Sequence, residues 1–200
     1  SCVYPVNGCS DELAINFDSN ATSSTSDSSC IFSHTLVINS GWSLISTYIQ
    51  PEVLDISIVF SPLVSNIVIL KNNVGSAFLP EYNFNGIGDM IAGQGYQIKL
   101  NSDDQLTIVG DQLHPELTPI ELTLGWNLIA YLRQLPADTG SVFEDMLING
   151  SLVIVKDSYG NAYLPEWNFN GIGDMVIGKA YHLKTNEAYT LVYLSNDQDY

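Results

Sequence analysis

The sequence predicts a mainly β protein, in which two homologous small β-sandwich or half-barrel domains follow a short disulfide-stapled, loop-rich motif. Residues 75–101 and 160–186 are identical at 17 of 27 aligned positions, at a fixed offset of 85. The apolar segments are short, rich in Val, Ile, Thr and Tyr, and interrupted by Gly or Pro too often for helices of ordinary length. All three cysteines lie within the first 30 residues. We therefore expect three units, at residues 1–33, 34–112 and 113–200.

The duplication extends upstream of this match. Three further features recur in both halves: Gly41-Trp42 with Gly125-Trp126, Val59-Phe60 with Val142-Phe143, and Lys71 with Lys156. Self-similarity at a fixed period indicates a duplicated folding unit. Because a catalytic centre seldom needs two equivalent copies in one chain, the duplication favours a structural or binding role over an enzyme.

The first unit depends on its cysteines. Its segment NFDSNATSSTSDSSC has neither helical nor strand periodicity, and so little apolar material needs a covalent staple. We expect Cys9 to pair with Cys30, which stabilises the motif by about 3 kcal/mol. Cys2 is then left to bond another unit or another chain, although its pairing with Cys9 or Cys30 stays an open alternative.

The first repeat is expected to begin with two short strands within residues 34–50, broken near Ser40-Gly41. A short helical or irregular stretch follows at residues 51–63. A hairpin then joins a strand at Ile67 to Lys71, through a turn at residues 72–75, to a strand that starts at Ser76. Residues 95–100 and 105–110 supply two more strands.

The second repeat follows the same plan. Its corresponding segments are residues 118–132, 136–147, 151–169, 180–184 and 189–194. Gly75 and Gly160 occupy the same place in the two hairpin turns, and Gly reaches positive φ without steric cost, so both turns are expected to depend on it. Residues 111–119, with two prolines, form a short and stiff linker.

Composition excludes some partners. The chain is 46% hydrophobic and 14% charged, which is too apolar for intrinsic disorder. Its net charge of -16 repels phosphate backbones and anionic lipid, so we expect neither nucleic acid nor membrane insertion. The sequence has no apolar run of roughly 20 residues and no basic, apolar signal-peptide start. We expect a mature, soluble protein or a fragment of a longer one.

The loop at residues 80–89 and its copy at 165–174 are the best candidates for a site. Oxygen ligands stand near a turn-forming Gly in each loop, at Asn83, Asn85, Asp89, Asn168, Asn170 and Asp174. This pattern is a diluted form of a calcium loop, although one Asp per loop predicts only weak Ca²⁺ binding and no cofactor is required. In the alternative interpretation the Asn side chains cap backbone groups, Phe84 and Ile87 fill the core, and Asp89 accepts backbone N–H bonds.

Aromatic residues suggest a second kind of site. Tyr82 and Trp167 lie next to turns at matched positions, and we predict that they are exposed and contact glycans. Trp42 and Trp126 begin apolar strands, and we expect them to be inward anchors, as large aromatics in small β domains usually are.

Evidence for catalysis is thin. His34, His114 and His182 have no repeated Ser, Cys or Asp partners, and no hydrolase, zinc-protease or nucleotide-binding motif occurs. Paired carboxylates for glycoside hydrolysis are not indicated. Asn20 and Asn149 match the N-glycosylation pattern, for which chance occurrence is the alternative.

Gly8 to Cys30, GCSDELAINFDSNATSSTSDSSC, resembles the repeat GCTDPxAxNYxxxATxDDGSC of very large secreted and surface proteins of Bacteroidota and of some aquatic microbes and viruses. The matching residues are Cys9, Asp11, Ala14, Asn16, Ala21, Ser29 and Cys30, whereas Ser10, Phe17, Ser26 and Ser28 depart from the pattern. In that pattern a further cysteine closes the preceding repeat, which implies that Cys2 belongs to an upstream unit. The duplicated module is similar to β-rich domains near the ends of the same kind of protein.

These observations and the resemblance together lead us to expect a non-catalytic extracellular structural protein, secreted or at the cell surface. It is expected to be an adhesin or a subunit of a filament assembled head to tail, and its partners would be copies of itself or neighbouring domains of a longer chain. Strand-like segments at Thr35 to Asn39 and Thr190 to Leu194 would permit end-to-end strand addition. The alternative is a carbohydrate-binding accessory module of a secreted polysaccharide-degrading enzyme.

Overall fold

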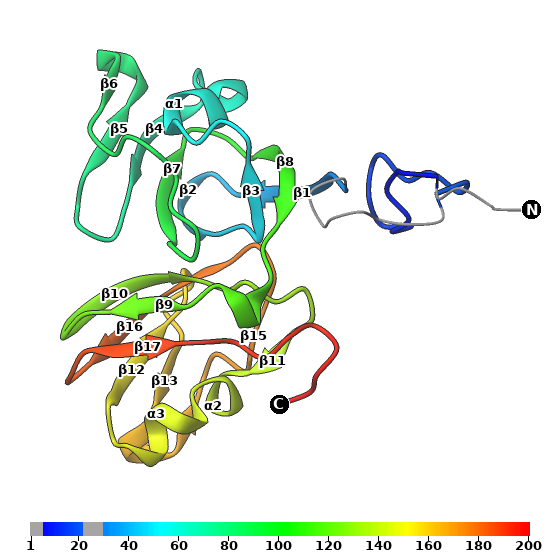
Figure 1. The fold of residues 1–200 in the computed structure, drawn as a ribbon. Helices are drawn as coiled ribbons and strands as arrows, with labels where there is room; N and C mark the ends of the chain where they lie inside the picture. The colour runs from blue at the N-terminus through cyan, green and yellow to red at the C-terminus, as the bar shows by residue number, and fades with distance from the viewer. Residues whose placement is uncertain (1–5, 22–29) are drawn as a thin grey trace, which may run out of the picture.

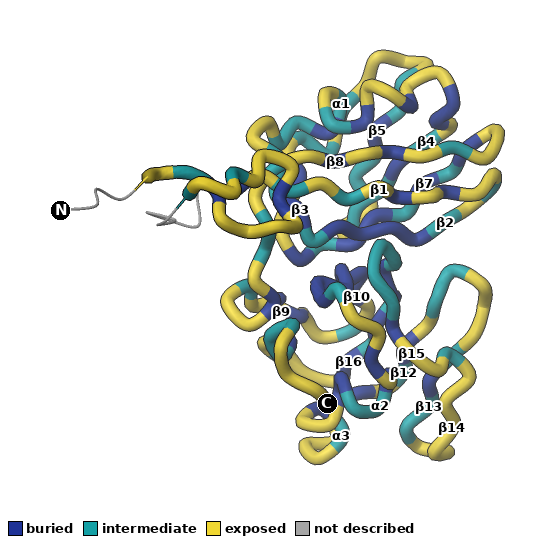
Figure 2. The backbone as a smooth tube through the Cα atoms, turned by 90° about the vertical axis from the view of Figure 1, so that its right-hand side faces the viewer, coloured by how far each residue is buried: buried dark blue, intermediate teal, exposed yellow. Residues whose placement is uncertain are grey.

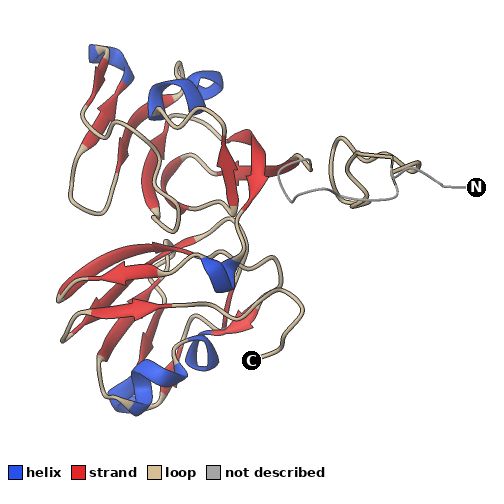
Figure 3. Cartoon of the chain, in the orientation of Figure 1, coloured by secondary structure: helices blue, strands red, loops and turns tan. Residues whose placement is uncertain are grey.

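The computed structural model describes residues 6–21 and 30–200. The fold is mainly β, as predicted, with 42% strand and 13% helix in several antiparallel sheets. Two β bodies stack on each other, and the N-terminal motif projects from the side of the first (Figures 1 and 3). No helix in the described part of the chain is both long and apolar enough to cross a membrane.

The first repeat contains two sheets. The five-stranded sheet has the order β2-β7-β4-β5-β6, formed by Gly41–Ile45, Tyr96–Leu100, Ile67–Lys71, Ala77–Leu79 and Phe84–Asn85. The three-stranded sheet has the order β1-β8-β3, formed by Phe32–Ile38, Asp104–Gln112 and Ile49–Pro51. Both sheets contribute to one core, which is completed by residues of α1 (Ile56–Val59) and η2 (Ser61–Leu63). This repeat is therefore a small sandwich.

The second repeat has the same five-stranded sheet. Its order is β10-β16-β12-β13-β14, formed by Gly125–Ala130, Ala180–Thr185, Leu152–Lys156, Ala162–Leu164 and Phe169–Asn170. Two small sheets pair β9 (Ile120–Leu122) with β17 (Tyr189–Leu191), and β11 (Ala137–Asp138) with β15 (Asp174–Met175). Two short helices, α2 (Thr139–Val142) and α3 (Glu144–Ile148), pack beside them. Its core is a separate cluster from that of the first repeat.

Both hairpin turns have the predicted geometry. Gly75 and Gly160 have φ of 83° and 91°, in the left-handed region that favours Gly. Asn72 Oδ1 accepts hydrogen bonds from the backbone N–H groups of Val74 and Ser76, and Asp157 does the same in the second turn. The strands at Ile67–Lys71 and from residue 77 onward also lie where the sequence predicted them.

The repeats differ where the smaller sheet forms. β1 and β8 share seven register pairs, whereas β9 and β17 share three. In the first repeat β3 pairs with β8, and Pro51 lies opposite Gly110. A Cβ added to Gly110 would lie 2.1 Å from the carbonyl oxygen of Gln50. The equivalent residue of the second repeat is Ser195, and β17 already ends at Leu191, so the strand does not extend that far. The second repeat consequently has no counterpart of β3.

The contact between the repeats is pseudo-symmetric. Backbone bridges join Ile45 to Lys179 and Gln94 to Ile129, and these are equivalent pairs with the repeats exchanged. The hydrogen bond from Ser46 N to Gly178 O (3.1 Å) is likewise matched by that from Ala130 N to Gly93 O (2.9 Å). Figure 2 shows the buried stretches of β2 and β10 at this junction. The two copies therefore meet as in an isologous, two-fold dimer.

The centre of this junction is apolar and tight. Leu44, its equivalent Leu128, and Ala180 form a small buried cluster. Ala180 corresponds to Gly95, and a Cβ added to Gly95 would lie 2.6 Å from the Cβ of Ala180. Because equivalent residues face each other there, only one of the two positions has room for a side chain.

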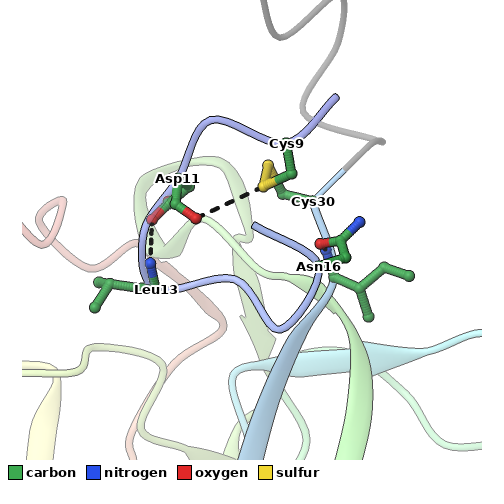
Figure 4. The surroundings of a disulfide bond; sticks show 6 residues. Cys9, Asp11, Leu13, Asn16 and Cys30 are labelled. Carbon is green, nitrogen blue, oxygen red and sulfur yellow. Dashed lines mark hydrogen bonds between the residues drawn. A yellow bond between two sulfur atoms is a disulfide. The ribbon is translucent and has the colours of Figure 1, made fainter. Parts of the chain in front are cut away.

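The N-terminal motif is held by a disulfide between Cys9 and Cys30, as predicted (Figure 4). Asp11 Oδ1 accepts a hydrogen bond from Leu13 N (2.9 Å), and Asn16 Oδ1 accepts one from Ile31 N (2.8 Å), which fastens the loop to the chain leading into β1. Ala14 packs against the two cysteines. Cys2 lies outside the described residues.

Replacing Cys9 and Cys30 with Ser is expected to unfold residues 8–21 locally and leave both repeats folded. In the part of the motif that the structure describes, the buried cluster consists of Cys9, Ala14 and Cys30, so the motif depends on a crosslink worth about 3 kcal/mol. Hydrogen exchange should rise sharply in peptides from residues 8–21 and remain unchanged at β7 and β16. Loss of protection in β7 would contradict this independence.

Candidate functional site

The outer faces of the two five-stranded sheets each carry an exposed tryptophan. Side chains alternate along a strand, so Ile45 of β2 enters the core while Trp42 and Leu44 point to the opposite face. Trp42 is 46% exposed, and its equivalent Trp126 is 48% exposed. The prediction that these two residues are inward anchors is therefore wrong. In β2 the core is reached by Ile45, whereas Trp42 lies on the opposite face of the strand.

Lysines surround both indoles. The ammonium groups of Lys71 and Lys99 lie 5.4 and 5.8 Å from the centre of the Trp42 ring, and that of Lys156 lies 5.3 Å from the Trp126 ring. Lys184 pairs with Trp126 across β10 and β16, as Lys99 pairs with Trp42 across β2 and β7. We call each set of one tryptophan and two lysines a Trp–Lys face: Trp42 with Lys71 and Lys99, and Trp126 with Lys156 and Lys184.

These faces are electrically distinct from the rest of the chain. They contain four of its six basic residues, whereas the ten strands of the two five-stranded sheets contain no Asp or Glu. The chain has 22 acidic residues in total. Within residues 6–21 and 30–200, the one side-chain ion pair shorter than 4.0 Å joins His114 to Glu116. The four lysines therefore keep their charge available beside an aromatic surface.

A shallow cleft adjoins the first Trp–Lys face. It lies between the repeats, has a volume of about 120 Å³, and is lined by Trp42 and Gln97 from one repeat and by Ser158 and His182 from the other. Asp157 also lines it, but both oxygens of that carboxylate accept hydrogen bonds within its own turn. The volume is well below the roughly 300 Å³ of typical small-molecule pockets, so the open face is the larger feature.

The asparagines predicted as metal ligands have structural partners. Asn85 Oδ1 accepts hydrogen bonds from Ile87 N and Gly88 N, and its Nδ2 donates to the Asp55 carboxylate. Asn170 makes the equivalent contacts, including a 2.8 Å bond to Asp138. This use of the amide follows the alternative interpretation, in which the side chain caps its own loop.

The remaining predicted ligands lie at the ends of the same loops. Asn83 and Asn168 adopt left-handed backbone conformations, with φ of 49° and 48°. Asp89 and Asp174 pair through their backbones with Asp55 and Asp138, respectively. The described residues contain no group of three or more His, Cys, Asp or Glu side chains arranged to hold a metal. Calcium binding stays a prediction.

Asp55 and Asp138 were missed from the sequence. Each caps the N-terminus of a short helix and also accepts a hydrogen bond from the side-chain amide of the matching Asn. The Asp carboxylate therefore links the loop to the helix. Hydrogen bonds from the Ser57 side chain and backbone lower the pKa of Asp55. The sequence does contain a signal for these two residues, since an Asp precedes Val59-Phe60 and Val142-Phe143 in both repeats.

The predicted glycan-contacting aromatics are exposed. Tyr82 and Trp167 are 70% and 71% exposed, at the ends of η3 (Pro80–Tyr82) and η5 (Pro165–Trp167). Phe84, which the alternative interpretation placed in the core, is 52% exposed, because its ring lies over Gly86 and an added Cβ there would approach it to 2.8 Å. Ile87 does pack against the core. Asn20 and Asn149 are exposed, so glycosylation stays a prediction for both.

The histidines occupy unrelated surroundings. His34 Nδ1 lies 3.1 Å from Thr47 Oγ1 and its ring packs on Tyr48, while burial lowers the pKa of His34 to about 4. Burial, and then the charge of Lys156, lower the pKa of His182, which meets Trp126 edge to face. His114 lies in the linker.

Stability is expected to depend on pH through His34. The unfolded chain binds a proton near pH 6.5, whereas the folded chain does so only near pH 4, so this contribution is complete above pH 6.5 and is lost as the pH falls toward 4. The difference in unfolding free energy between wild type and His34→Gln should shift by about 2 kcal/mol between pH 7.5 and 4.5 in urea titrations. A constant difference would contradict the burial of a neutral imidazole.

Comparison with known proteins finds no matching family model, no matching curated protein and no matching solved structure.

Proposed function

We propose that this chain is a non-catalytic extracellular adhesin module, which contacts its target through the two Trp–Lys faces. The observation that carries the proposal is the matched pair of half-exposed tryptophans, each with unpaired lysines beside it. Exposed aromatic and cationic side chains of this kind are more typical of a contact surface than of a packed core.

The duplication supports a binding role. Two equivalent faces in one chain allow two simultaneous contacts, and linked contacts raise avidity without new interactions. Backbone bridges and the buried cluster around Leu44 and Leu128 hold the repeats together. The target would therefore meet two faces in a defined relative orientation.

An extracellular location is supported by the Cys9–Cys30 disulfide, since such bonds persist in oxidising compartments. The resemblance of residues 8–30 to a repeat of secreted surface proteins points the same way. Mass spectrometry of the native protein without added oxidant should find this bond intact.

Adhesion can be tested with beads coated with the whole chain. The target panel would contain insoluble neutral polysaccharides, cross-linked acidic polysaccharide gels and protein matrices. Beads carrying the wild-type chain should resist shear on at least one surface, and beads carrying Trp42→Ala/Trp126→Ala should detach at least tenfold more readily. Uncoated beads are the control. Equal detachment of wild-type and uncoated beads from every surface would refute the adhesin role.

A second candidate is assembly into a filament by strand addition. It is favoured by β1, a seven-residue strand at the edge of its sheet, paired within the sheet only with β8. Exposed edge strands are templates for pairing with another chain. Electron micrographs of concentrated wild-type protein should show fibres that Thr35→Pro abolishes, since proline cannot donate a backbone hydrogen bond. Monodisperse particles at all concentrations would exclude this assembly.

A further inference from the structure

We propose that the ligand of the Trp–Lys faces is an anionic polysaccharide, whose sugar rings stack on the indoles and whose carboxylate or sulfate groups meet the lysines. This proposal rests on the adhesin role and specifies the chemistry of its target. It follows from three properties of the faces: their planar aromatic surface, their uncompensated positive charge, and their open shape.

The aromatic surface explains stacking. Indole rings offer a large, rigid and amphipathic contact, and each of the two here is about half exposed. The lysines beside Trp42 approach its ring from neighbouring strands, β4 and β7, which leaves part of the ring exposed to solvent. A pyranose ring presents the flat C–H surface that such an indole accommodates.

The charge pattern selects an anion. Lys71, Lys99, Lys156 and Lys184 lie on sheets whose strands have no carboxylate, although acidic residues outnumber basic ones by 22 to six in the whole chain. Without a ligand, the ammonium groups of Lys71, Lys99 and Lys156 lie near an indole ring, a contact worth about 0.5–1 kcal/mol at an exposed site. A carboxylate placed beside the ring would satisfy two lysines of one face at once.

The net charge of -16 limits which polyanion fits. Repulsion from distant carboxylates is screened beyond about 8 Å at physiological salt, whereas a lysine–carboxylate contact is shorter than that. Double-stranded DNA carries one charge about every 1.7 Å, so it would extend over acidic surface as well as the lysines. A polysaccharide with separated acidic groups can place them on the faces alone.

The open shape suits a chain. The cleft beside Trp42 is about 120 Å³ and is bordered by polar groups of Gln97, Ser158 and His182, and by the Asp157 carboxylate, whose oxygens accept hydrogen bonds within their own turn. It is too small for a long ligand, but it adjoins the exposed face. A polymer laid over the sheet could therefore place one sugar near this cleft and continue across the strands.

The test is affinity electrophoresis in gels that contain polygalacturonate, heparin or dextran. Wild-type protein should be retarded by polygalacturonate or heparin and not by neutral dextran. Because heparin carries both carboxylate and sulfate groups, retardation by polygalacturonate would show that carboxylates suffice, whereas retardation by heparin alone would show that sulfate is required. Trp42→Ala/Trp126→Ala should weaken retardation at least tenfold. The quadruple Lys→Gln variant at positions 71, 99, 156 and 184 should do the same, and it keeps the test valid if the tryptophan variant fails to fold.

Phe84→Ala/Phe169→Ala is the matched control, because it removes two aromatic side chains that are each 52% exposed and belong to neither Trp–Lys face. It should bind within twofold of wild type. Equal retardation in dextran, no retardation in either polyanion, or loss of binding only in this control would overturn the proposal. If beads coated with wild-type chain still hold neutral surfaces in that case, the adhesin role stands and only the ligand class is wrong.

Discussion

Replacing Gly95 with Val is expected to separate the two repeats while leaving each sheet folded. A side chain there would meet the Cβ of Ala180 at 2.6 Å and the backbone oxygen of Ile129 at 2.8 Å. The bridge from Gln94 to Ile129 cannot persist at these distances, and the cost should be about 3 kcal/mol. Calorimetry should then resolve two unfolding transitions where the wild type has one.

A side-chain exchange tests the pseudo-symmetry directly. Gly95→Ala alone should destabilise the junction, and adding Ala180→Gly should recover part of the loss, since one methyl group again occupies the space between the equivalent positions. Ala180→Gly alone is the control. If the double variant is no more stable than Gly95→Ala, the two positions do not share this space.

Gly110→Ala is expected to destabilise the first repeat strongly and to leave the second repeat folded. The new Cβ would lie 2.1 Å from Gln50 O and 2.8 Å from Pro51 Cα, both of which belong to the backbone of β3. No rotamer change can relieve this contact, so β3 should detach from β8 at a cost of at least about 3 kcal/mol. Hydrogen exchange should increase in peptides covering residues 48–51 and 110–113.

Gly75→Ala is the comparison for that result. Gly75, unlike Gly110, has a backbone conformation that favours Gly, with φ of 83°, and an added Cβ there has open space. It should cost only about 1 kcal/mol, from backbone strain. Similar losses for the two variants would show that the close approach of β3 to Gly110 adds no cost of its own.

The strands of the five-stranded sheets were predictable because local signals agree there. At Ile67 to Lys71, β-branched residues, a turn asparagine and a Gly with positive φ all favour one hairpin. Other elements depend on distant partners. β11 and β15 are two residues each, and they pair because Asp138 caps a helix and binds Asn170 across 32 positions. No window of sequence contains that information.

The candidate site was predictable in part. Exposure of Tyr82 and Trp167 followed from their turns. The face of Trp42 could not be predicted, because the adjacent apolar residues Leu44 and Ile45 lie on opposite faces of the strand and do not reveal which of the two faces the core. The gathering of Lys71 and Lys99 on one indole requires β2, β7 and β4 to be neighbours. That order is a property of the sheet, which long-range pairing determines.

The two-fold character of the junction sets how such a protein can grow. Each copy presents the same patch to the other, and after pairing neither copy has that patch left to offer a third. The two repeats thus form a closed pair. Solenoid repeats differ, because each of them keeps a surface that can bind a further repeat. A longer array of such repeats would therefore consist of successive two-repeat pairs, with a spacer segment between one pair and the next.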